Sequence, residues 1–121
     1  MPTSVSAARR VARRALFVAA SIVAAPALAA TWYVDVGGAQ QTFSPQTQIA
    51  YAGDTVVFLN RGGVHNVVAD NGAFRCARGC DNDGMGGSGA ATGYLWITSV
   101  TFPNAGTYGY FCETHGTPGV G

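Results

Sequence analysis

The chain of 121 residues is long enough for a single domain, and only 11% of its residues are charged, whereas 17 are glycine. Its seven arginines and six carboxylates give a formal net charge of +1, and it has no lysine. Four of the arginines lie within the first 14 residues, so residues 30–121 carry a net charge of −3. This net negative charge excludes a basic patch that could bind a nucleic acid or an anionic membrane surface.

Residues 1–29 have the pattern of a signal peptide that is removed on export. Arginines between residues 9 and 14 form a basic start, an apolar run covers residues 15–25, and Ala27-Leu28-Ala29 is the small-residue arrangement that signal peptidase cleaves. The apolar run is too short and alanine-rich for a membrane span, although a retained anchor is the alternative. The paired arginines also fit a twin-arginine route. We therefore expect a periplasmic or secreted protein whose domain covers residues 30–121.

Residues 30–121 read as short strands separated by turns, with no stretch of helical periodicity. A glycine-rich polar stretch at residues 78–93 predicts a long exposed loop. The expected strands cover residues 31–36, a run before the turn at 52–54, and residues 55–59, 65–70, 94–102 and 107–112. Short strands with a turn about every ten residues favour an all-β sandwich or barrel.

The chain has three cysteines, an odd number for an exported protein. Cys76 and Cys80 are close in sequence, and the simplest pairing is a disulfide between them. That pairing leaves Cys112 free, and a metal that binds the thiolate would explain a free thiol in an oxidising compartment. The alternatives are an inert buried Cys112, or a disulfide from Cys112 to one of the other two cysteines.

The two histidines of the chain both have places that relate them to Cys112. His115 follows Cys112 by three residues, a spacing that lets one tight loop present both side chains to a single point. His65 opens a strand after Gly62-Gly63-Val64. Two histidine nitrogens and one thiolate are the trigonal ligand set of a blue-copper electron-transfer centre.

Two segments make the chain resemble the cupredoxins of the plastocyanin and azurin superfamily, as found in bacteria. They are "AGDTVVFLNRGGVHNVVAD" and "FPNAGTYGYFCETHG". The resemblance implies a Greek-key β-sandwich, a mononuclear copper site with His65, Cys112 and His115 as ligands, and transport of single electrons. It also implies that Asn66 fastens the ligand loops together, and that Tyr108 is similar to a tyrosine-corner residue.

The tail departs from the family pattern, which has an axial methionine and a last strand after the second histidine. No methionine follows His115, and Val120 stands five residues on. We expect a domain that is C-terminally incomplete and lacks its last strand. The other interpretation is a three-coordinate copper site with an apolar residue facing the ion. Met85 lies in the glycine-rich loop and is not expected to be a ligand.

The sequence predicts a copper-binding electron carrier that is not an enzyme. As nucleophile and base, Cys112 and His115 would lack an orienting partner other than Glu113. The alternatives for the same site are a periplasmic copper carrier or chaperone, and a zinc-binding module. We expect a monomer that meets a redox protein in transient contacts, with the electron passing through the exposed edge of His115.

Overall fold

A computed structural model describes residues 2–8, 28–93, 95–117 and 119. In this part of the chain no helix is long and apolar enough to cross a membrane. The strands are β1 (Thr3–Ala8), β2 (Thr31–Gly37), β3 (Phe43–Ser44), β4 (Thr47–Tyr51), β5 (Thr55–Gly62), β6 (Val67–Ala69), β7 (Arg75–Cys76), β8 (Ile97–Thr101) and β9 (Gly106–Phe111).

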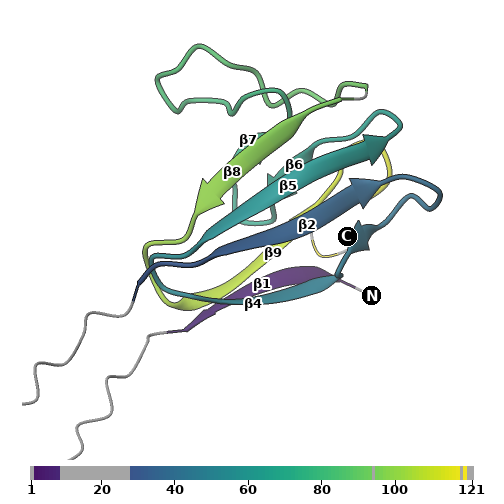
Figure 1. The fold of residues 1–121 in the computed structure, drawn as a ribbon. Helices are drawn as coiled ribbons and strands as arrows, with labels where there is room; N and C mark the ends of the chain where they lie inside the picture. The colour runs from purple at the N-terminus through teal and green to yellow at the C-terminus, as the bar shows by residue number, and fades with distance from the viewer. Residues whose placement is uncertain (1, 9–27, 94, 118, 120–121) are drawn as a thin grey trace, which may run out of the picture.

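The strands form two sheets that pack face to face, as Figure 1 shows. One sheet has the order β4-β1-β9-β6-β7, and the other has the order β3-β2-β5-β8. Both sheets mix parallel and antiparallel pairs. In the first sheet β1 runs parallel to β4 and antiparallel to β9, and in the second β5 runs parallel to β2 and antiparallel to β8. The all-β cupredoxin-like sandwich that the sequence predicts is therefore confirmed.

The core between the sheets is built by alternation along each strand. In β5, Val56 and Phe58 are fully buried while Val57 between them is half-exposed, as expected for a strand with one face on the core. The rings of Phe43 and Phe58 lie edge-on to the ring of Tyr110, with centroids 4.8 and 5.3 Å from it. Such edge-to-face contacts between large buried rings hold the two layers together.

Most of the expected strands are present, and their ends shift by a few residues. The strand expected at residues 65–70 is shorter as β6, and the strand expected at residues 94–102 is shorter as β8, with the buried residues Trp96 and Phe102 on either side of it. Tyr94 lies outside the described residues. The tyrosine corner is confirmed, because the Tyr108 hydroxyl donates a 2.9 Å hydrogen bond to the Asn104 carbonyl.

The N-terminal strand β1 lies inside the region that the sequence assigns to a signal peptide. It pairs in parallel with β4 and antiparallel with β9, so it fills the position between these two strands (Figure 1). Val5 is fully buried and Ala7 nearly so. In the chain that still carries its first eight residues, β1 therefore closes the edge of β9.

The cysteine pairing left open by the sequence is settled in favour of Cys76 and Cys80, which form a disulfide. Cys112 is free and buried. The disulfide closes the start of the long loop between β7 and β8, which stands out from the sandwich in Figure 1. Residues 82–88 of this loop are all exposed, as the glycine-rich composition predicts.

Candidate metal centre

His65 lies just before β6, and hydrogen bonds from its backbone hold it in place. Its N–H donates to the Thr92 carbonyl and its carbonyl accepts from the Thr92 N–H, both at 3.1 Å. The side chain is 3% exposed. Glycines leave the space for its ring: a β-carbon on Gly37 would lie 2.3 Å from His65 Nε2, and one on Gly63 would lie 2.6 Å from it.

The imidazole of His65 presents its two nitrogens to different neighbours. Nδ1 lies 3.8 Å from the Cys112 sulfur, and the ring also hydrogen-bonds with the backbone of Gly62. Burial lowers the pKa of His65, the Gly62 hydrogen bond opposes this, and the nearby His115 lowers it further. A neutral imidazole fixed by a backbone partner is the form that binds a metal ion.

Cys112 and His115 come from the loop that follows β9. The His115 N–H and the Gly116 N–H both donate to the Cys112 carbonyl, at 3.2 and 2.8 Å, so the chain turns back within four residues. Cys112 is 4% exposed, whereas His115 is exposed. The ring centroids of His115 and His65 lie 4.9 Å apart.

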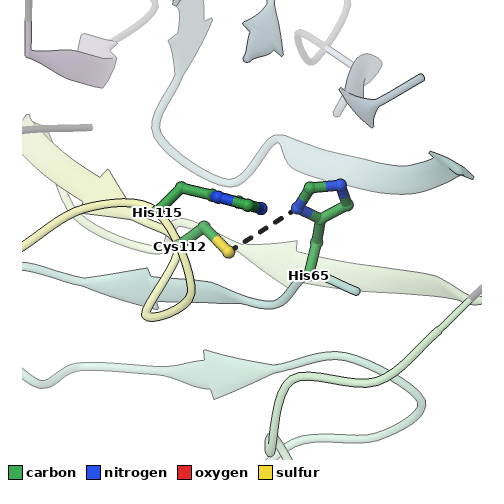
Figure 2. Close-up of side chains that lie close together, drawn as sticks. All are labelled: His65, Cys112 and His115. Atoms are coloured by element: carbon green, nitrogen blue, oxygen red, sulfur yellow. Dashed lines mark hydrogen bonds between the residues drawn. The ribbon is translucent and has the colours of Figure 1, made fainter. Parts of the chain in front are cut away.

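The donor atoms of His65, Cys112 and His115 all lie within 4.8 Å of one another. Figure 2 shows the three side chains pointing toward a common point, with the Cys112 sulfur facing a nitrogen of His65. Metal–nitrogen and metal–sulfur lengths of about 2.0 and 2.3 Å keep two donors of one ion within roughly 4 Å. The Cys112 sulfur and His65 Nδ1, which are 3.8 Å apart, already meet this distance. A soft sulfur together with two imidazoles is a ligand set that fits copper.

Asn66 joins the two segments that carry the donor atoms, as the resemblance implies. Its Oδ1 accepts a 3.0 Å hydrogen bond from the Glu113 N–H, and its Nδ2 donates at 3.1 Å to Glu113 Oε1. The same Nδ2 donates at 2.9 Å to the Gly89 carbonyl. Asn66 is fully buried, and its side chain holds the residue after His65 and the residue after Cys112 together.

Arg75 extends this network to the long loop. Its guanidinium donates to Glu113 through Nε and through Nη2, and Nη1 donates at 2.8 Å to Asp81 Oδ2. Asp81 Oδ1 in turn accepts from the Gly89 N–H at 2.7 Å. We call Asn66, Glu113, Arg75, Asp81 and Gly89 the polar ring, because these hydrogen bonds form a closed circuit.

Charges within the polar ring stabilise one another. The Arg75 guanidinium is the main cause of the lowered pKa of Glu113, and the hydrogen bond from Asn66 adds to it. The Gly89 N–H, followed by Arg75, lowers the pKa of Asp81. Both acids are therefore charged at neutral pH, and their hydrogen bonds are of the stronger, charge-assisted kind.

Arg75 and Gly37 were not identified from the sequence as parts of the site. Both contacts join residues far apart in the chain, so no local motif signals them; the glycine pair Gly37-Gly38 at the end of a strand is the only hint. Met85 is 85% exposed, consistent with its exclusion as a ligand. Val120 lies outside the described residues.

Comparisons with known proteins agree with this site. The family model described as copper binding proteins of the plastocyanin/azurin family matches residues 30–121. Chloroplastic plastocyanin of Chlamydomonas reinhardtii is 35% identical over 119 residues, covering 95% of this chain and 80% of its own. Those of Tetradesmus obliquus and Hordeum vulgare are 32% and 31% identical, covering 93% and 88% of this chain and 77% and 68% of their own.

The family match covers strands β2 to β9 and the segments that carry His65, Cys112 and His115. The matches indicate a carrier of electrons with a single copper ion, which contacts redox partners and is not an enzyme. The chain belongs to the plastocyanin/azurin family of copper-binding proteins.

Proposed function

We propose that His65, Cys112 and His115 are the ligands of the copper ion through which this protein carries single electrons. The observation that carries the proposal is the convergence of their donor atoms to within 4.8 Å of one another. Bound copper would supply the one-electron change between Cu(I) and Cu(II), and a His2Cys set lies between the preferences of the two states. The polar ring supports the proposal because it fixes the backbone next to two of the three ligands.

We propose that electrons enter and leave through His115. It is exposed, whereas His65 and Cys112 are buried, so its ring is the part of the site that a partner can approach. Its neighbours Gly116 and Thr117 are small and uncharged. A small rim of this kind suits a brief contact between a monomer and its redox partner, in place of a lasting complex.

We also propose that the protein works in the periplasm or outside the cell after residues 1–29 are removed. The basic start, the apolar run and Ala27-Leu28-Ala29 support this proposal. The disulfide between Cys76 and Cys80 is a second support, because disulfides persist in oxidising compartments. The match to the copper-binding family begins at residue 30.

The absorption spectrum of the exported protein after addition of copper(II) tests the ligand set. We expect an intense visible band from charge transfer between the Cys112 thiolate and the ion, at one copper per chain. Cys112→Ser should abolish the band. Met85→Leu is the matched control, since it removes an exposed sulfur that is not among the converging donor atoms, and it should leave the band unchanged.

Two results would contradict the proposal. One is a protein that takes up copper(II) without the thiolate band, which would place the ion elsewhere. The other is a band that survives in Cys112→Ser. Zinc(II) added to the copper-free protein separates the zinc alternative: a zinc module would bind zinc so tightly that copper(II) does not displace it, against the usual order of affinities.

A further inference from the structure

A buried carboxylate lies at the point where the predicted signal peptide ends. Asp54 is fully buried in the turn between β4 and β5. Its Oδ1 accepts a 2.8 Å hydrogen bond from the N–H of Ala30. Its Oδ2 accepts from Trp32 Nε1 at 2.8 Å and from the Tyr51 N–H at 2.9 Å. Burying a carboxylate is costly, and such N–H donors offset the cost.

The nitrogen that faces Asp54 is the one that cleavage after Ala29 would convert into a chain terminus. Ala29 is the last residue of the Ala27-Leu28-Ala29 arrangement. Leu28 is 82% exposed and Ala29 is exposed as well, so the two residues directly before Ala30 stand clear of the sandwich. The backbone of Ala30 is already in place, because its carbonyl accepts a 3.0 Å hydrogen bond from the Thr55 N–H.

We propose that Ala29–Ala30 is the processing site and that Asp54 binds the α-ammonium group of Ala30 in the processed chain. Hydrolysis of the amide by a signal peptidase consumes one water and yields the carboxylate of Ala29 and the ammonium of Ala30. The neutral N–H donor 2.8 Å from Oδ1 thereby becomes a cation. A buried carboxylate gains much more from a paired cation than from a neutral amide. The proposal rests on the export proposed above.

This binding would anchor the start of β2 at the end of the sandwich away from the metal centre. Thr31 of β2 pairs with Thr55 next to Asp54, whereas Gly37 at the other end of β2 lies against His65. Six residue steps along a strand separate these ends by roughly 20 Å. Changes at Asp54 can therefore be measured without disturbing the copper ligands.

The absence of lysine makes the terminus chemically unique. In the chain that begins at Ala30 the α-amine is the only amine, so an acetylating reagent has one amine target. The reagent attacks the uncharged amine. A carboxylate partner that raises the pKa of the α-amine by one unit lowers the uncharged fraction about tenfold at neutral pH. Acetylation followed by mass spectrometry therefore reports the contact directly.

The experiment starts from the full chain, expressed with export, and the processed protein is purified. We expect an intact mass that begins at Ala30, and acetylation about tenfold or more slower in the folded protein than in denaturant. Asp54→Asn should lose most of this protection. Asp35→Asn is the matched control, since it removes an exposed carboxylate from β2, the strand that begins after Ala30, and it should keep the protection.

A second variant covers the case in which Asp54→Asn does not fold. Insertion of one glycine between Ala29 and Ala30 keeps Asp54 and the amide hydrogen bond of Ala30, but moves the ammonium about 3.4 Å along the chain. Its folded form should be acetylated about as fast as its unfolded form. A protein that keeps its leader, a start at another residue, or equal acetylation rates in the folded and unfolded wild type would overturn the proposal.

The visible band of the same samples separates this proposal from the copper site. A copper band with an unprotected α-amine would overturn only the binding by Asp54. A protected α-amine without the band would support that binding and overturn only the copper ligands.

Discussion

Gly37 determines how closely the backbone of β2 can approach His65. Its φ is +70°, in the region that favours glycine. A β-carbon at this position would lie 2.3 Å from His65 Nε2 and 2.4 Å from the Gly62 carbonyl oxygen. Both contacts are too short to keep, so any side chain here moves the ligand.

Gly37→Ala should therefore damage the copper site beyond its cost to the backbone. Gly53→Ala is the control, because Gly53 has a φ of +90° but open space around its β-carbon position. We expect both variants to lose about 1 kcal/mol or more of unfolding free energy to strain, and only Gly37→Ala to bind copper at least tenfold more weakly. Copper titrations and urea unfolding measure the two effects. Equal copper affinities in both variants would show that the crowding at His65 is relieved without cost.

Arg75 acts on the ligand loop through Glu113. Its side chain is 35% exposed and that of Glu113 is 38% exposed, so solvent screens the ion pair and its contribution to stability is at most about 1 kcal/mol. Its larger effect is positional, because Glu113 stands next to Cys112 and is also held by Asn66. Groups that orient a metal ligand typically change metal affinity about 10- to 100-fold when they are removed.

Arg75→Met should speed copper release about tenfold while lowering the unfolding free energy by no more than about 1 kcal/mol. Arg61→Met is the matched control, since Arg61 forms a 2.9 Å ion pair with Asp35 outside the polar ring. In the copper-free protein, hydrogen exchange at the Glu113 amide should be faster in Arg75→Met alone. If both variants released copper at the wild-type rate, the polar ring would have no role in positioning.

Strand β1 has a different status from the other strands, because it belongs to the segment proposed to be removed. While it is present, Val5 is fully buried between β4 and β9. Its removal would leave the edge of β9 open, and β9 leads into the ligand loop. An open strand edge is a site where other strands can pair.

The variant Val5→Lys should affect the unprocessed chain and the processed chain differently. In the unprocessed chain, burial of an unpaired ammonium should lower the unfolding free energy by several kcal/mol. Ala8→Lys, at the exposed end of β1, should change it little. The processed protein made from either variant should have the same urea midpoint as the wild type. An unprocessed Val5→Lys protein with an unchanged midpoint would show that β1 does not contribute to the fold.

The elements that the sequence predicts well are those whose own residues determine them. Strands β2, β5 and β9 are rich in β-branched and aromatic residues, and β2 and β5 end at paired glycines. Strand β1 was not predicted, because its short alternating pattern precedes an arginine-rich run that indicates a leader. Strand β7 has two residues, and its pairing with β6 comes from tertiary structure.

The residues of the candidate site also fall into those that the sequence predicts and those that it does not. His65, Cys112 and His115 could be predicted because the residue types themselves carry the chemistry, and the structure brings them together. The pairing of Arg75 with Glu113 spans 38 residues, and the sequence has no signal for which of its charges meet. The crowding of His65 by Gly37 depends on the distance between two backbones, which the sequence does not encode locally.

On the scale of the whole molecule, the charges of residues 30–121 are few and mostly paired. Asp35 pairs with Arg61, and both Asp81 and Glu113 pair with Arg75. Asp54 is buried. The net charge of −3 therefore produces only a weak field around the exposed His115.

Electron transfer to a redox partner should accordingly depend little on salt. Steered association slows steeply as the Debye length falls from roughly 30 Å at 0.01 M to roughly 8 Å at 0.15 M salt. For the processed, copper-loaded protein we expect a second-order rate constant that changes less than about threefold over this range, because long-range attraction contributes little. Stopped-flow oxidation by a small cationic and a small anionic complex measures it. A tenfold fall with the cationic complex would require a concentrated acidic surface, which the pairing of Asp35, Asp81 and Glu113 with arginines argues against.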